Sequence, residues 1–196
     1  MNTTQPIRDL HALQTFKNYY RDTECNFRNY TLIIMGLNTA LRINDILHIK
    51  WGDVYDFDTL KLLDHIEIKE KKTGKPNRIV INQQLNRILS EFLIFSQTGN
   101  SLTKNSYLFR SRKGTNSPLS RCQAFRIIKK AAIFAGFPEN VSCHSLRKTF
   151  GYHAWKQGVQ PALLMNIYNH SSYQITKRYL GIEQDDKDTV FLNVNL

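Results

Sequence analysis

The chain has 196 residues, of which 27 are Lys or Arg and 16 are Asp or Glu, so its formal net charge at pH 7 is +11. Hydrophobic residues make up 41% of the chain, which suits one packed domain and excludes wholesale disorder. The three cysteines include no CxxC pair, which excludes a disulfide framework or a zinc site and favours a reducing compartment.

The first half of the chain predicts helices followed by a β-hairpin. Apolar residues recur at helical spacing in residues 7–20, 27–37 and 42–49, and Pro6 is acceptable as the first helical residue. Residues 65–69 and 78–81 alternate polar and apolar side chains on either side of Thr73-Gly74-Lys75-Pro76. Alternation around a turn-forming segment is typical of a β-hairpin, here with a basic tip.

The second half predicts further helices. They cover residue 82 or 83 to 96, then 120–135, 145–157, 161–168 and 172–179. Ser120 is a suitable N-cap, and Gly136 and Gly158 are suitable stops. Residues 190–196 alternate weakly and predict a strand or an extended arm. The fold class expected is mainly α with a small antiparallel β-sheet.

The positive charge is concentrated in one part of the chain. Residues 92–182 contain 13 basic residues and a single acid, Glu139, whereas residues 183–196 contain four acids and one lysine. A folded segment of this kind attracts polyanions, which favours a nucleic-acid partner. The alternatives are a solubility surface or an anionic membrane. The longest apolar run, residues 32–37, is too short to span a bilayer, and no basic amphipathic helix with a broad apolar face is evident.

Four polar side chains in the last third of the chain suggest chemistry on an anion. His144 and Arg147 are three residues apart and project from one helix face, so an imidazole and a guanidinium stand side by side. His170 follows Asn169 at a predicted helix end, and Tyr179 follows nine residues later behind two basic residues. Taken singly, each of these features is also common on an ordinary protein surface.

The order of these residues resembles the tyrosine recombinases of the phage-integrase family. Thr39-Ala40-Leu41-Arg42 resembles the family's first arginine motif, and Lys72-Thr73-Gly74 looks like its β-hairpin lysine. His144-x-x-Arg147 matches its HxxR box, Asn169-His170-Ser171-Ser172 resembles its LGHSS box, and Tyr179 falls at the spacing of its nucleophile. The resemblance runs from about residue 27 to 181 and includes small fimbrial phase-variation invertases. It departs at Ala40 and Asn169, which stand where the family usually has glycine.

The resemblance implies a chemistry that the residue types support. Tyr179 attacks a DNA phosphate to give a 3′-phosphotyrosine, and His144 takes the phenol proton. Arg42 and Arg147 bind the phosphate oxygens, His170 donates a further hydrogen bond, and Lys72 protonates the departing 5′-oxygen. No ATP, metal ion or other cofactor is implied. Further DNA contacts are expected from basic residues in the hairpin, the following loop and the helix after Ser120, namely Lys71, Lys75, Arg78, Arg110, Arg112, Lys113, Arg121 and Arg126.

The resemblance also implies an organisation and a setting. We expect residues 1–182 to form one catalytic domain without a separate N-terminal DNA-binding domain, and residues 183–196 to form a tail that protomers exchange. The implied partners are a double-stranded recombination site, a homotetramer on DNA and accessory DNA-bending proteins, in a cytoplasmic, nucleoid-associated setting without a membrane.

Two other functions remain open at this point. A type IB topoisomerase uses the same chemistry on a single duplex. A DNA-binding regulator descended from a recombinase needs the basic face but has no use for Tyr179.

Overall fold

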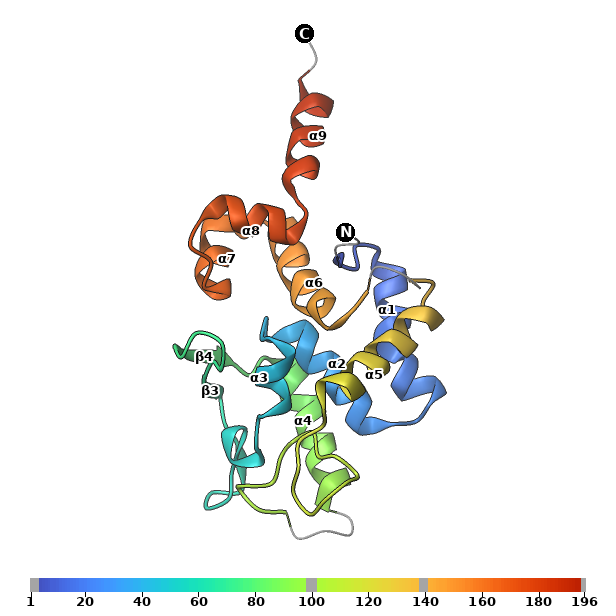
Figure 1. Cartoon of the computed structure of the whole chain (residues 1–196), viewed down its shortest axis with the longest axis vertical. Helices are drawn as coiled ribbons and strands as arrows, with labels where there is room; N and C mark the ends of the chain where they lie inside the picture. The colour runs from blue at the N-terminus through green and yellow to red at the C-terminus, as the bar shows by residue number, and fades with distance from the viewer. Residues whose placement is uncertain (1–3, 98–101, 138–140, 195–196) are drawn as a thin grey trace.

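The computed structural model describes residues 4–97, 102–137 and 141–194 and is mostly helical, as predicted (Figure 1). The α-helices are α1 (Leu10–Asn18), α2 (Phe27–Asn38), α3 (Ile43–Leu47), α4 (Gln83–Gln97), α5 (Arg121–Phe134), α6 (Cys143–Lys156), α7 (Pro161–Tyr168), α8 (Tyr173–Leu180) and α9 (Glu183–Asn193). Two antiparallel pairs of strands join β1 (Tyr55–Asp56) to β2 (Lys61–Leu62) and β3 (His65–Lys69) to β4 (Pro76–Val80).

Helix α2 is the centre of the main core. Its residues from Asn29 to Gly36 are all buried, because the sequence is apolar around most of the helix rather than on one stripe. Helices α1, α3, α4 and α6 all pack against it. A Cβ at Gly36 would clash with Leu146 of α6, so the glycine allows the close approach that brings α6 to the core.

The β3–β4 hairpin lies beside α3 and carries a basic turn. Ile66 is paired with Ile79 across the strands, and Ile66 is buried while Glu67 and Lys69 face solvent. This alternation is the pattern that predicted the hairpin. Gly74 adopts a φ of 68°, a left-handed conformation that glycine tolerates without strain.

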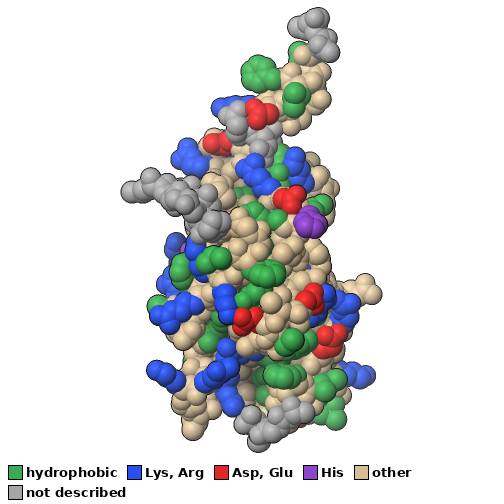
Figure 2. All heavy atoms as spheres, turned by 90° about the vertical axis from the view of Figure 1, so that its right-hand side faces the viewer, with side chains coloured by type: hydrophobic (Ala, Val, Ile, Leu, Met, Phe, Trp, Pro, Cys, Tyr) green, Lys and Arg blue, Asp and Glu red, His purple; other side chains and the backbone are tan. Residues whose placement is uncertain are grey.

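Helices α6, α7 and α8 form a second, smaller packed unit. Its fully buried side chains include Leu164, Tyr168 and Leu180, which pack beneath Tyr152 of α6. Figure 1 shows α7 and α8 above the β3–β4 hairpin, with α9 extending away from the rest of the molecule. In Figure 2, apolar side chains are exposed on that projecting end.

The predicted start of the first helix is wrong. The helix begins at Leu10, where the Asp9 carboxylate caps it by accepting the amide N–H of Ala12. Pro6 and Ile7 precede it as extended chain, and the Ile7 amide donates to Thr149 Oγ1 of α6. A tertiary hydrogen bond therefore replaces the predicted first helical turn.

The prediction of a strand or extended arm for residues 190–196 is also wrong for the described part, up to residue 194. Helix α9 continues to Asn193. The acidic residues at the start of α9 suit a helix N-terminus, where negative charge is favourable. This signal outweighs the weak alternation of residues 190–196. Four short elements were not predicted from the sequence: β1, β2, the π-helical turn Tyr19–Thr23 and the 3-10 turn Trp51–Asp53.

Candidate active site

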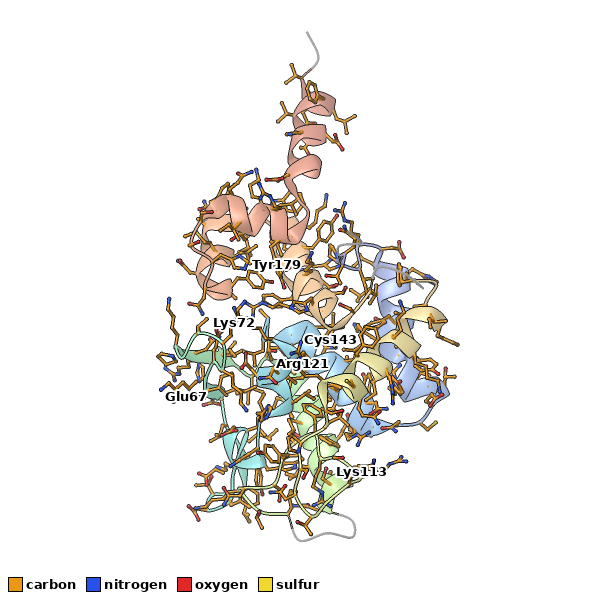
Figure 3. All side chains as sticks on the ribbon, viewed as in Figure 1. Glu67, Lys72, Lys113, Arg121, Cys143 and Tyr179 are labelled. Carbon is orange, nitrogen blue, oxygen red and sulfur yellow. The ribbon has the colours of Figure 1, made fainter. Side chains whose placement is uncertain are left out.

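A basic pocket lies where the hairpin, α3, α5 and α6 meet. Its volume is about 390 Å³, and Figure 3 shows Lys72, Arg121 and Cys143 entering this region from three different elements. None of its lining residues is acidic: they are Leu41, Arg42, Ile43, Asn44, Lys71, Lys72, Arg121, Cys143, His144 and Arg147. Residues 42, 72, 144 and 147, which the sequence analysis selected, thus meet at one site that attracts anions.

Arg147 joins the two packed units. Its side chain is almost fully buried in α6, and its guanidinium donates hydrogen bonds to the carbonyl oxygens of Ala40 and, at 3.1 Å, of Tyr168. The guanidinium carbon lies 4.5 Å from the centre of the Tyr168 ring. In return, the Tyr168 hydroxyl donates to the Arg147 carbonyl at 2.8 Å. The arginine therefore fixes both chain segments that flank it.

Both residues that depart from the family's glycines adopt left-handed backbone conformations. The φ angles of Ala40 and Asn169 are both 54°. Asn169 is the C-cap of α7, a position where asparagine is the best substitute for glycine. Alanine has no such preference for the left-handed conformation, so Ala40 lowers the stability of the fold by about 1–2 kcal/mol. The two carbonyls that Arg147 binds belong to Ala40 and to Tyr168, the neighbour of Asn169, so the two turns meet at this side chain.

Arg42 stands at the N-cap position of α3, and its side chain is held by a buried carboxylate. Its Nη1 lies 2.6 Å from Oε2 of Glu70, whose side chain is completely buried. Burial alone would raise the pKa of Glu70, but the hydrogen bonds from Thr73 and Arg42, together with the charge of Arg42, hold it below its usual value. Glu70 is thus ionised at neutral pH. Glu70 was not predicted as a site residue, because no pattern in the neighbouring sequence indicates that its side chain is buried.

His144 and His170 are both biased towards the neutral form. The protein atoms around His144 displace water from it, and the nearby cations Arg121, Lys148, Arg147 and Arg42 lower its pKa further. Burial also lowers the pKa of His170, and the charges of Arg147 and Arg42 add to the effect. A neutral imidazole accepts a proton, which suits His144 to act as a base.

His170 is fixed by contacts on both sides of its ring. Its Nδ1 lies 3.0 Å from Oγ1 of Thr176, a buried residue of α8. Its ring stacks against Tyr168, with centroids 5.4 Å apart, and meets Tyr179 edge-on at 5.1 Å. The side chain is therefore oriented before any ligand binds.

Tyr179 lies next to His170 and is surrounded by positive charge. Lys148 Nζ is 5.1 Å from the centre of its ring, and the Tyr168 ring is 5.5 Å away. Burial raises the pKa of Tyr179, while the charges of Arg147 and Arg42 oppose the rise. The phenol is therefore protonated at neutral pH and needs a base before it attacks. Tyr168 and Lys148 were missed by the sequence analysis, because their role depends on packing.

Two other kinds of chemistry are not supported at this pocket. Burial raises the pKa of the Cys143 thiol to about 11, so it is not a thiolate nucleophile at neutral pH. In the described parts of the chain, no three His, Cys, Asp or Glu side chains gather as a metal site would require.

Among the described residues, every helix is too short or too polar to cross a bilayer.

The residues predicted to contact DNA fall into two groups. Lys71 and Arg121 line the pocket, and Lys75, Arg78 and Arg126 are exposed on the hairpin or on α5. Arg110, Arg112 and Lys113 lie on a separate loop; Arg110 lines a different, mostly apolar hollow of about 320 Å³, and Figure 3 places Lys113 far from Tyr179. The structure therefore brings Lys71 and Arg121 to the pocket, whereas Arg78 lines a separate hollow beside Glu67 and Arg110 lines another.

Comparison with known proteins gives a consistent result along almost the whole chain. Residues 9–185 match the phage integrase family. The chain is 40% identical over 185 residues to the probable integrase/recombinase YoeC of Bacillus subtilis strain 168, which covers 94% of this chain and 93% of YoeC. It is 29% identical over 156 residues to the type 1 fimbriae regulatory protein FimE of Escherichia coli K12, which covers 78% of this chain and 73% of FimE.

The fold is that of a solved recombinase. The XerH site-specific recombinase, in a post-cleavage complex with its palindromic difH substrate, superposes with a TM-score of 0.70 at 21% identity. The match covers 90% of this chain and 48% of the XerH chain, so this chain spans about half of that protein.

Proposed function

The chain belongs to the phage integrase family, whose members are tyrosine-type DNA strand transferases, and on this premise we propose that it cuts and rejoins DNA through a covalent bond to Tyr179. Site-specific DNA recombination is the activity of this family. The observation that carries the proposal is the pocket in which Arg42, Lys72, His144 and Arg147 meet, beside His170 and Tyr179. The individual roles below are part of the proposal.

In the first step, Tyr179 Oη attacks the phosphorus of a phosphodiester. His144 takes the phenol proton as the new P–O bond forms. The bond from phosphorus to the 5′-oxygen breaks, and Lys72 gives that oxygen a proton. The products are a 3′-phosphotyrosine and a free 5′-hydroxyl. A 5′-hydroxyl of another strand reverses the step and seals the DNA, so the energy of the phosphodiester is conserved.

The charge in the transition state is compensated by protein cations. Arg42 and Arg147 each present several N–H donors to the non-bridging oxygens, and His170 donates one more. Such preorganised donors stabilise developing negative charge, and losing one costs roughly 10²–10³ in rate. We therefore propose a reaction that needs neither a metal ion nor ATP.

The proposed assembly is a tetramer on two recombination sites, formed with the help of DNA-bending proteins. Helix α9 supports an exchange of tails between protomers, because it projects from the body and exposes 81% of Phe191 and 83% of Leu192. Residues 1–182 are then the catalytic domain and residues 183–196 the exchanged tail. A Phe191→Ser and Leu192→Ser double variant should cleave one duplex normally but fail to form tetramers in analytical ultracentrifugation with DNA.

The decisive experiment is capture of the covalent intermediate. Binding-site selection from random duplexes first identifies the preferred site, and a nicked duplex of that site then traps the adduct on a denaturing gel. We expect the wild type to form an adduct in the presence of EDTA and without ATP, and Tyr179→Phe to form none. An adduct that persists in Tyr179→Phe contradicts the assignment.

The same preparation separates the alternatives. Relaxation of supercoiled plasmids that lack a paired site favours a topoisomerase. Tight binding without any adduct favours a regulator.

A further inference from the structure

Glu70 holds three side chains on one buried carboxylate. Oε2 accepts hydrogen bonds from Arg42 Nη1 at 2.6 Å and from Thr73 Oγ1 at 2.9 Å. Oε1 accepts one from Asn77 Nδ2 at 3.1 Å. The side chain is 0% exposed, whereas Glu67, on the solvent face of β3, is 71% exposed. Glu70 is therefore placed quite differently from the acid three residues before it (Figure 3 labels Glu67).

The backbone of Glu70 also closes the turn that carries Lys72. Its N–H donates to the Lys75 carbonyl at 2.9 Å, and its carbonyl accepts the Gly74 N–H at 2.8 Å. The Lys71 N–H donates to Oδ1 of Asp45, a residue of α3, at 2.9 Å. The turn and the helix that Arg42 opens are thus tied together at two points, Glu70 and Lys71. Lys72 directly follows these residues in sequence and lines the same pocket.

An ion pair whose carboxylate is completely buried, while Arg42 keeps 22% of its side chain exposed, needs an explanation other than stability. Removing charge from water is costly, and well-packed apolar residues are often as stable as the pair they replace. What the pair does supply is a fixed geometry between groups that are far apart in sequence. Arg42 and Glu70 are separated by 28 residues, and the pair sets the distance between α3 and the hairpin turn.

We propose that Glu70 is a positioning residue for DNA cleavage, which keeps the proton donor Lys72 at a fixed distance from the phosphate-binding Arg42 by holding both the arginine and the lysine's turn. This inference rests on the proposed function. A displacement of about 1 Å in a reacting group costs on the order of 10²-fold in rate. Losing the Glu70 carboxylate should therefore slow cleavage by a similar factor without removing any group that touches DNA.

The test compares two leaving groups in Glu70→Gln. One nicked duplex has the ordinary 5′-oxygen at the cleavage point, and a second has sulfur in its place. A thiol, with a pKa near ~8.5, leaves without the proton that an alcohol requires, so the sulfur substrate does not depend on Lys72. We expect the single-turnover rate of Glu70→Gln to fall about 100-fold on the oxygen substrate. On the sulfur substrate the fall in rate should be at least tenfold smaller. The matched control, Glu67→Gln, should lose less than about twofold on both.

A purely structural role gives a different pattern. If Glu70 serves only the fold or only Arg42, the loss is equal on both substrates, and this outcome overturns the proposal, as does an unchanged rate on the oxygen substrate. Should Glu70→Gln fail to fold, as judged by circular dichroism, Thr73→Val removes one donor to Glu70 from an exposed turn and should show the same preference for sulfur, more weakly. An equal loss in Thr73→Val would again overturn it.

The result also separates this inference from the proposed function. If the wild type forms no adduct on either substrate, both fail. If the wild type cleaves and the two leaving groups respond equally in Glu70→Gln, only the role of Glu70 fails.

Discussion

The two sides of the pocket rest on cores of very different size. Arg42 and Lys72 are attached to the main core, which runs through α2, α4 and α5 and includes Leu32, Trp51 and Phe109. His170 and Tyr179 are attached to a small unit whose buried cluster has six members: Ala40, Tyr152, Leu164, Tyr168, Leu180 and Ile182.

The difference in core size predicts that the two sides of the proposed site differ in rigidity. Regions with few buried apolar contacts open locally at lower free energy than a large core does. The side that carries Arg42, the proposed phosphate ligand, is therefore the more rigid one, and the side that carries Tyr179, the proposed nucleophile, is the one able to adjust. Arg147 connects them through the carbonyls of Ala40 and Tyr168.

Arg147→Ala should have the largest effect, because it removes a proposed phosphate ligand and the link between the two units at once. We expect cleavage to slow by at least about 10³-fold, the upper end of the range for one preorganised donor. Hydrogen exchange should also accelerate in α7 and α8 but not in α2. Arg87→Ala on the exposed face of α4 is the control and should keep its cleavage rate within about threefold. Unchanged exchange in α8 would show that Arg147 does not connect the units.

His144→Gln should slow cleavage by at least about 10²-fold, since general-base catalysis is typically worth that much. In the wild type the pKa of His144 lies below its ordinary value, so the ring is neutral at pH 7 and ready to accept a proton. The rate should be flat between about pH 7 and 8 and should fall as the pH drops below the ordinary histidine range, where the imidazole becomes charged. The variant should lack this acidic limb. A wild-type rate that increases towards low pH would contradict the role of base.

Gly151→Ala should affect only the small unit. A Cβ at this position would clash with Tyr168 and Leu180, and overpacking of this kind costs about 1–3 kcal/mol. We expect faster hydrogen exchange in α7 and α8 and weaker adduct formation, with the main core unchanged. Gly36→Ala, which clashes with Leu146, is the matched variant in the main core and should lower the global free energy of unfolding in urea. Identical exchange patterns in the two variants would show that the units are not separate.

Ala40→Gly should have the smallest effect and the opposite sign. Glycine relieves about 1–2 kcal/mol of strain in the left-handed conformation. Its greater backbone freedom in the unfolded chain lowers stability by roughly 0.5–1 kcal/mol. We expect a net gain of up to about 1.5 kcal/mol in the free energy of unfolding, measured in urea. Ala131→Gly in the interior of α5 should instead lose about 1 kcal/mol. A loss of the same size in Ala40→Gly would argue against strain at this turn.

Most of the fold could be predicted from the sequence because its signals are local. The N-cap Ser120, the stop at Gly136 and the alternation around Thr73 each act over a few residues, and the structure confirms all three. The errors at Pro6 and at residues 190–194 occurred where the local signal was weak and a hydrogen bond to Thr149 or a helix-favouring acidic start prevailed.

The order of the candidate site residues could likewise be predicted from the sequence, but their surroundings could not. The Glu70 side chain is completely buried because it pairs with Arg42, 28 residues away, and because the hairpin packs against α3. The contacts of Tyr168 with Arg147 and Tyr179 depend on the packing of α7 and α8 on α6.

The sequence by itself therefore determined which chemical groups the chain carries, their order and the helices or turns that present them, because these follow from periodicity and side-chain type. Only the tertiary structure decided that a guanidinium from α3, a lysine from the hairpin and a histidine–arginine pair from α6 share one pocket. Such meetings depend on core packing between distant segments, where a glycine that admits a neighbouring helix matters as much as the residues that react.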